Sequence, residues 1–380
     1  MIDFRYHLVS IVAVFLALAV GIVLGTTMLQ DPLLHTLQSE TADLREQSED
    51  LRAEKDNASR FNAGGDELVS AYADEMLHNR LSGVRVAVLE SPGVHEDMRE
   101  GVIARIKQAG GRVPGRLVFT DTYIDTEQSA FINDLTDQAA EDIDLPEGTS
   151  HERAGAVLAR AVLRSAGDQD DKDGAEDKDG EDGKGGAEDG EDGEKGTTER
   201  KDGTKGDTDV DAEAVLAAFG EAGLLTVHGE PAEKADIGVI LAPAQAFPAD
   251  EDASSPHEDE PPPGNRIMLA LAQAFDRASD GAVVVGGASS VGHNGLVAQA
   301  RAEEAEYSTV DVAGRATGDV AAALAVAAAA EARSGHYGIG EGAEGFLPDP
   351  PPEDRGESST SQDRKSPPRR GDGDSRSSAD

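Results

Sequence analysis

The sequence predicts an α/β protein that is held on a membrane by a single N-terminal helix. Three observations carry this prediction: an uncharged stretch near the N-terminus, a polar segment with regularly spaced leucines, and short apolar runs that alternate with helical segments. The expected order is a transmembrane helix, a helical stalk and an α/β domain with a parallel sheet, interrupted by an acidic insertion.

The uncharged stretch LVSIVAVFLALAVGIVLGTTML covers residues 8–29. As a helix it is about 33 Å long, against a hydrocarbon core of about 30 Å. The apolar part of a signal peptide is only about 7–15 residues and ends at a small-x-small cleavage site. The nearest such site here is the weak Gly25-Thr26-Thr27. We therefore expect a retained anchor, with a cleaved signal as the alternative.

The charges around this span predict its orientation. Arg5 and His7 precede it, whereas the first lysine or arginine after it is Arg45. The positive-inside rule then places residues 1–7 in the cytoplasm. The expectation is a single-pass protein of the cell membrane with the bulk of the chain extracytoplasmic.

The segment at 31–62 is predicted to be a helical stalk. Leu37, Leu44 and Leu51 recur every seven residues, which is the spacing of one core position in a coiled coil. The other core positions carry polar residues, so this seam alone predicts only weak pairing. Gly21 and Gly25 add a GxxxG spacing inside the span, which favours close helix approach. Together these residues predict a homo-oligomer formed through span and stalk.

The α/β domain begins after Gly64-Gly65, where we expect the stalk to end. A strand at 84–89, a turn and helix to residue 109 and a strand at 116–119 form a βαβ unit with short connections, which implies a parallel sheet. The alternation recurs with expected helices at 211–222, 266–278 and 319–332 and expected strands at 237–242, 282–285 and 308–312. Because these strands are continuously apolar, helices should cover both faces, as in a flavodoxin-like or Rossmann-like three-layer domain.

The domain is predicted in two parts, the first at 66–166 and the second at 210–246 and 265–347. The acidic insertion at 167–209 has no aliphatic residue larger than Ala and is predicted to be disordered. No register of its acids matches the calcium-binding loop of an EF-hand. A Pro-rich acidic loop at 247–264 and a tail at 348–380 are also predicted to lack regular structure.

Composition excludes several functions. The formal charge of −41 makes nucleic acid an unexpected partner, because no face is basic enough to hold a phosphate backbone. The absence of cysteine removes disulfides, thiolate metal sites and cysteine nucleophiles together.

Two loops deserve comparison with catalytic motifs. The segment ESPGVHEDM at 90–98 follows a parallel strand, where open α/β sheets bind ligands, but it lacks both GxGxxG and GxxxxGK[ST]. The segment at 287–292 has the spacing GxSxxG rather than the GxSxG of a nucleophile elbow. Ser289, Ser290 and His293 leave a hydrolase as a distant alternative, and we expect no enzyme activity.

Metal binding is the other kind of site that the sequence could form. Met76 with His78, and His95 with Met98, are soft-ligand pairs of a kind that copper uses. The alternative is that these four residues are ordinary core or surface residues, since the chain has no Met-rich or His-rich tract. No tightly bound cofactor is expected.

Several segments together resemble one actinobacterial family. They are MIDFRYHLVSIVAVFLALAVGIVLG at the N-terminus, the leucine-spaced stalk, VRVAVLESPG, and the run STVDVAGRATGDVAAALAVAAAAEARSGHYGIG with its SGHYG at 334–338. The chain is similar to the family named after the mycobacterial copper transport protein B. The resemblance implies copper homeostasis, with copper as a transported ion. It also implies an outer-membrane, pore-forming role in copper efflux for the mycobacterial member. It brings no metal-binding residues that map onto this sequence.

The function expected is therefore that of a non-enzymatic envelope protein of copper transport. The alternative is a membrane-anchored scaffold or interaction module with no direct copper role.

Overall fold

The computed structural model describes residues 3–140, 145–164, 211–248 and 261–356, without the side chains of residues 3 and 26–38. The predicted acidic insertion at 167–209 and most of the loop at 247–264 and of the tail at 348–380 lie outside these residues. The chain divides into two compact units, Met1–Gly65 and Asp66–Asp380.

The first unit consists of the N-terminal part of helix α1 (Asp3–Leu77). Its segment Phe4–Gly25 is exposed throughout and is long and apolar enough to cross a membrane by length and composition, and no other described helix is. The division between the two units falls at Gly65, where the stalk was expected to end, but the helix does not break there, because α1 continues through both glycines. Each glycine costs a helix only about 1 kcal/mol, which the helix-forming residues on either side offset.

The second unit is built on a seven-stranded sheet in the order β3-β2-β1-β4-β5-β6-β7. The strands are β1 (Val86–Glu90), β2 (Gly115–Phe119), β3 (Leu225–Gly229), β4 (Ile237–Leu241), β5 (Ala282–Val285), β6 (Ser308–Val310) and β7 (His336–Tyr337). All neighbours pair in parallel except β3, which runs antiparallel to β2. The sheet is thus mixed, and the expectation of a wholly parallel sheet is wrong at this edge.

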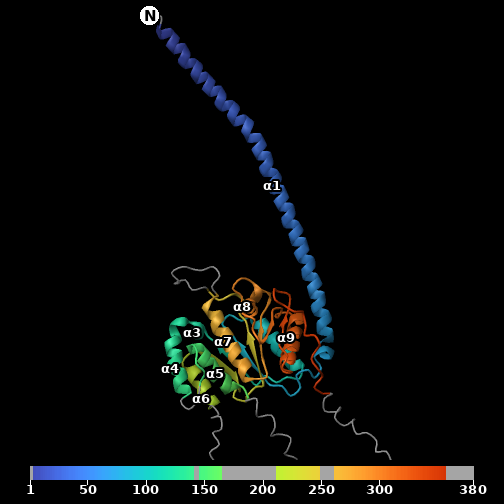
Figure 1. The fold of residues 1–380 in the computed structure, drawn as a ribbon. Helices are drawn as coiled ribbons and strands as arrows, with labels where there is room; N and C mark the ends of the chain where they lie inside the picture. The colour runs from blue at the N-terminus through green and yellow to red at the C-terminus, as the bar shows by residue number, and fades with distance from the viewer. Residues whose placement is uncertain (1–2, 141–144, 165–210, 249–260, 357–380) are drawn as a thin grey trace, which may run out of the picture. The chain divides into compact units, whose positions relative to one another are not determined.

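Helices cover both faces of the sheet, as the continuously apolar strands predicted (Figure 1). One face packs against the last turns of α1 together with α2 (Glu96–Gln108) and α9 (Ala316–Ala329). The other face carries α3 (Asp121–Ile124), α4 (Ser129–Ala139), α5 (Ser150–Val162), α6 (Ala212–Glu221), α7 (Pro263–Ala278) and α8 (Leu296–Ala302).

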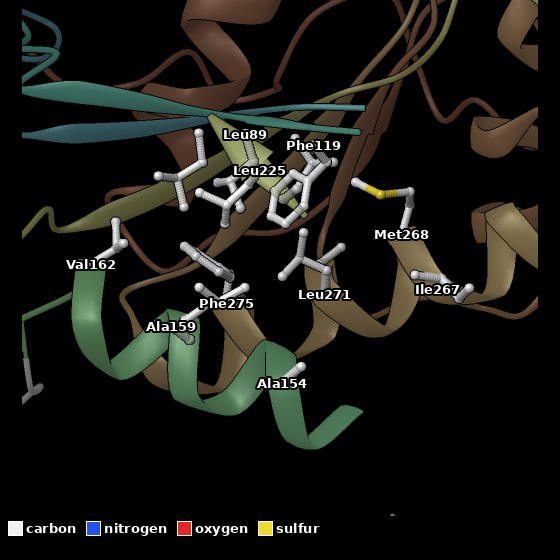
Figure 2. Packing of buried hydrophobic residues seen from close by; sticks show 14 of the residues in the cluster. Leu89, Phe119, Ala154, Ala159, Val162, Leu225, Ile267, Met268, Leu271 and Phe275 are labelled. Carbon is white, nitrogen blue, oxygen red and sulfur yellow. The ribbon is translucent and has the colours of Figure 1, made fainter. Parts of the chain in front are cut away.

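The core beneath α7 shows how the second of these faces is filled. Figure 2 shows Leu271 and Phe275 of α7 directed toward strand residues Leu89 and Phe119, with α5 alongside. Phe275 approaches the backbone of β4 so closely that a Cβ at Gly238 would lie 2.8 Å from its ring. Position 238 must therefore be a glycine for α7 to pack this closely on β4.

The alanine-rich helix α9 is almost completely buried, which confirms that it packs on the sheet rather than spanning a membrane. Its start is held by Asp66, the first residue of the second unit. The Thr317 amide and hydroxyl donate to Asp66 Oδ1 at 3.1 and 2.8 Å, and Arg315 Nε donates to Oδ2 at 2.9 Å. A carboxylate at a helix N-terminus satisfies otherwise unpaired amides and complements the helix dipole.

Candidate functional site

The carboxyl edge of the sheet is where the structure brings functional loops together. The loop after β1 leads to α2 on one face, whereas the loop after the neighbouring strand β4 leads to α7 on the opposite face. Such a divergence leaves a crevice outside the strand ends, where open α/β sheets bind ligands.

A hollow of about 860 Å³ lies at this divergence, and we call it the switch-point hollow. Its walls come from the β1–α2 loop, from α3 and from the segment after β4. It is lined by Pro92, Gly93, Val94, His95, Glu96, Asp121, Thr122, Ile124, Asp125, Pro243, Ala244, Gln245, Ala246, Phe247 and Pro248. Among the residues that the structure describes, the lining combines three carboxylates with apolar side chains and contains no lysine or arginine.

A smaller hollow of about 220 Å³ adjoins it and shares His95, Pro243 and Ala244 with it. Here the structure brings together one of the predicted metal pairs, because His95 and Met98 both line this space. His95 is exposed just before α2, whereas Met98 is buried in the first turns of that helix.

The other predicted pair does not form a comparable site. Met76 is half-buried against the apolar cluster on the α9 side of the sheet. His78 is exposed, and its Nε2 lies 3.0 Å from Asn79 Nδ2. Within the described ranges, no group of three or more His, Asp or Glu side chains is arranged to hold a metal ion.

Beneath the β1–α2 loop lies a buried carboxylate, Glu90, which sequence analysis treated only as part of a turn. It forms an ion pair with Arg116 from β2, and Arg99 Nη1 of α2 lies 3.8 Å from its Oε2. Arg99 also pairs with Glu96 at 2.7 Å. These arginines are thus engaged in fixing the loop to the strand.

The serine loop shows no catalytic pairing. Residues 288–291 form a short 3₁₀ helix in which Ser290 is buried and its hydroxyl donates to the Gly287 carbonyl at 2.6 Å. His293 is exposed, and no hydrogen bond joins it to either serine in the described structure. The geometry therefore offers no activated serine here.

The SGHYG segment at 334–338 has a structural role. The Arg301 side chain is 3% exposed and donates to Asp311 Oδ2 at 2.7 Å, while Asp311 is 0% exposed. Arg301 also donates to Thr309 Oγ1 at 2.9 Å and to the Tyr337 carbonyl at 3.0 Å. Asp311 in turn accepts from the backbone amides of residues 339 and 340 at 2.9 and 3.0 Å.

Gly338 completes this arrangement with a φ of +136°, where any Cβ would overlap the Asp311 carboxylate. The glycine is required because only it combines this backbone conformation with so close an approach. Sequence reasoning recognised SGHYG as a signature but not as the cover of a buried ion pair. A buried Arg placed ten residues before a buried Asp gives no local sequence signal.

The chain is similar in sequence to one known family. A family profile described as "Copper transport outer membrane protein, MctB" matches residues 1–348. The protein named copper transporter MctB of Mycobacterium tuberculosis (strain H37Rv) is 30% identical over 174 residues, which cover 44% of this chain and 54% of that relative. The protein of the same name in Mycobacterium leprae is 33% identical over 129 residues, covering 34% of this chain and 41% of that relative. The chain thus spans about half the length, or less, of the curated relatives it matches.

The fold and its apolar first helix define a membrane-associated α/β protein. Within that class, the chain belongs to the MctB copper transport family. The resemblance inferred from the N-terminal block and the SGHYG segment is confirmed.

Proposed function

We propose that this protein is a single-pass envelope protein of copper homeostasis, with its α/β domain outside the cytoplasmic membrane and no enzyme activity. The observation that carries the proposal is the family match over residues 1–348, which includes both the apolar helix and all seven strands of the sheet. The relatives are named copper transporters, and copper efflux and an outer-membrane location come to this chain as part of the proposal.

The hollow lined by His95 and Met98 is the proposed point of contact with copper. Imidazole nitrogen and thioether sulfur both suit Cu(I), and this is the predicted pair that lines a shared space. A contact of two protein ligands fits a transient encounter with a transported ion better than a permanent metal centre.

Copper tolerance tests both the copper role and the assignment of His95 and Met98 as the contact with copper. Deleting the gene in the organism that carries it is expected to raise cellular copper and lower the tolerated copper concentration. His95→Ala with Met98→Leu should reproduce the loss, whereas His78→Ala with Met76→Leu should not, because Met76 is half-buried against the sheet while His78 is exposed. Unchanged tolerance and copper content after deletion would refute the copper role.

Oligomerisation through α1 is the second part of the proposal. Leu44, Leu51 and Phe61 are all strongly exposed on the first unit, with Ala58 continuing the seven-residue spacing of the leucines. A helix with such an apolar line is stabilised by pairing with a second helix of the same kind. Gly21 and Gly25 have open space around them, which allows close approach within the span. Leu37 belongs to the same line, and its side chain lies outside the described set.

Full-length protein in detergent tests this pairing. Leu44→Glu with Leu51→Glu should shift the mass measured by analytical ultracentrifugation toward the monomer. Ala42→Glu with Ala53→Glu adds the same two charges away from the leucine line and should leave the mass unchanged. Equal masses for all variants would refute pairing through this line.

A second candidate function is an envelope scaffold without a direct copper role. It is favoured by the lack of any cluster of three or more metal-binding side chains among the described residues. Wild-type copper tolerance in the deletion strain, combined with a defect in envelope integrity, would support this candidate over the first.

A further inference from the structure

The switch-point hollow has features that the copper proposal does not use. Its volume of about 860 Å³ lies within the range of about 300–1,000 Å³ found for small-molecule sites. It lies where loops from β1 and β4 diverge to opposite faces of the sheet, which is the usual place for a ligand in an open α/β domain.

Buried polar atoms without partners accompany the hollow. The hydroxyls of Ser91 and Tyr123 are both buried and have no hydrogen-bond partner in the described protein. Ser91 directly precedes the lining residue Pro92, and Tyr123 lies between two lining residues of α3. Buried hydroxyls are nearly always paired in native proteins, because a buried hydroxyl without a partner loses its hydrogen bonds to water and gains none in return.

The direction of Ser91 follows from the sheet. Its amide donates to the Leu241 carbonyl at 3.1 Å, so Ser91 continues the ladder between β1 and β4. Alternation along the strand then places its side chain on the same face as Leu89, the face that also carries Tyr123 and Phe247. Both residues therefore lie on this face of the sheet directly behind lining residues of the hollow, although neither side chain is itself part of the lining.

The negative charge of the lining favours a cationic ligand. Glu96, Asp121 and Asp125 line the hollow, and none of the described lining residues is a lysine or arginine. Ile124, Val94 and Phe247 supply apolar surface beside these carboxylates. A protonated amine on an apolar body matches both features, since carboxylates and hydroxyls accept its N–H groups and the side chains cover its body.

We propose that the switch-point hollow binds a small organic cation, namely a protonated amine carried on an apolar body. The ammonium group is held by Asp121 and Asp125, since Glu96 is paired with Arg99, and the body packs toward Ile124 and Phe247. This binding does not depend on the copper role, since it uses carboxylates rather than the His95–Met98 pair.

The test uses the full-length chain in lipid nanodiscs and three probes with one shared body. Benzylamine is cationic, benzyl alcohol is neutral and phenylacetate is anionic. Saturation-transfer NMR, corrected with empty nanodiscs, reports binding of each. Benzylamine is expected to bind at least about tenfold more tightly than benzyl alcohol, because charge-assisted hydrogen bonds contribute about 1.5–3 kcal/mol. Phenylacetate is expected not to bind.

Three variants locate the site. Asp121→Asn with Asp125→Asn should weaken benzylamine by about tenfold or more, and Ala246→Trp should block it by filling the hollow. Asp134→Asn removes an exposed carboxylate of α4 outside the lining and should change nothing. An unchanged far-UV circular dichroism spectrum confirms that each variant is folded.

Three results would overturn the proposal. The first is equal affinity for benzylamine and benzyl alcohol, and the second is benzylamine binding that survives loss of both aspartates. The third is displacement of benzylamine by CuCl₂ or CaCl₂ beyond that caused by NaCl at the same ionic strength, which would make the hollow an inorganic cation site.

Discussion

At the scale of single residues, the ion pair of Arg301 with Asp311 is important for stability, because both charged groups are buried away from water. Asp311→Ala leaves the guanidinium buried without its carboxylate and is expected to lower the free energy of unfolding by about 3–5 kcal/mol. Urea unfolding of the full chain measures the loss. Asp137→Ala removes a half-exposed partner of Arg153 and should cost less than about 1 kcal/mol. Equal losses would show that burial does not set the energy of these pairs.

Two buried serines at the carboxyl edge make a matched pair that differs in hydrogen bonding. Ser91 has no partner, whereas Ser290 donates to the Gly287 carbonyl. Ser91→Ala is therefore expected to be neutral or to stabilise the ligand-free protein by up to about 1 kcal/mol, and Ser290→Ala to destabilise it by about 1 kcal/mol. Thermal unfolding distinguishes them. A loss at Ser91 as large as that at Ser290 would mean that Ser91 is paired in solution.

Asp319 makes stability depend on pH. Burial raises the pKa of Asp319 to about 6, although the Gly314 amide donates to it at 2.8 Å and lowers the pKa in part. The folded protein thus binds this proton more tightly than the unfolded chain, in which the pKa is about 3.9. The contribution of Asp319 to stability therefore increases as pH falls from about 7 to about 4.

Asp319→Asn checks this assignment, because the amide oxygen can still accept from Gly314. The free energies of unfolding in urea of the wild type and the variant should differ most near pH 7 and least near pH 4, with a change on the order of 1–3 kcal/mol between them. A difference that does not depend on pH would contradict the raised pKa.

Asp66 makes stability depend on pH in the opposite direction. Burial pushes its pKa upward, but hydrogen bonds from Thr317 and Arg315 lower the pKa overall. Its contribution is therefore lost as pH falls below about 4.

At the scale of elements, the contact of α2 with α9 depends on Gly101. A Cβ at Gly101 would overlap the Asp319 carboxylate, so Gly101→Ala must displace one helix or the buried side chain. We expect a loss of about 1–3 kcal/mol in urea unfolding, as for other overpacked cores. Gly64→Ala in the open part of α1 has nothing within 4 Å and should be neutral or stabilising. Similar effects of the two changes would show that the α2–α9 contact is loose.

Elements with strong local signals were predictable, and those without them were not. The strands at β1, β4 and β5 and the helices α2, α7 and α9 follow from continuous apolar runs next to amphipathic segments. Helix α5 was missed, although Thr149 and Glu152 form a capping box that marks its start. Strand β3 was missed because LTVHG alternates on an edge with only one buried residue, and its antiparallel direction is set by pairing with β2.

At the scale of the whole molecule, orientation in the membrane is the main prediction. The chain has no cysteine, so a single introduced cysteine is a unique label. Glu213→Cys on the exposed side of α6 is expected to react with a membrane-impermeant maleimide in intact cells lacking an outer envelope barrier. The same substitution in lysed cells is the control for reactivity. Labelling only after lysis would place the domain in the cytoplasm and refute the proposed topology.

The candidate site was only partly predictable at this scale. The loop at 90–98 was identified because its position after a parallel strand is local information. Its neighbours Asp121, Asp125 and Phe247 come from segments about 30 and 150 residues away, and only the strand order brings them together. His95 and Met98 line one hollow because they lie three residues apart at the start of α2, whereas the places of Met76 and His78 depend on which face of α1 packs on the sheet.

The guanidinium of Arg301 also joins two parts of the chain that are synthesised at different times. Two of its acceptors, the carbonyls of Tyr337 and Glu341, belong to residues synthesised about 40 positions later. Until those residues leave the ribosome, Arg301 lacks both acceptors and strand β7 cannot join the sheet. A form that ends before residue 336 lacks β7 and both carbonyls, and we expect it to be less stable than the full chain.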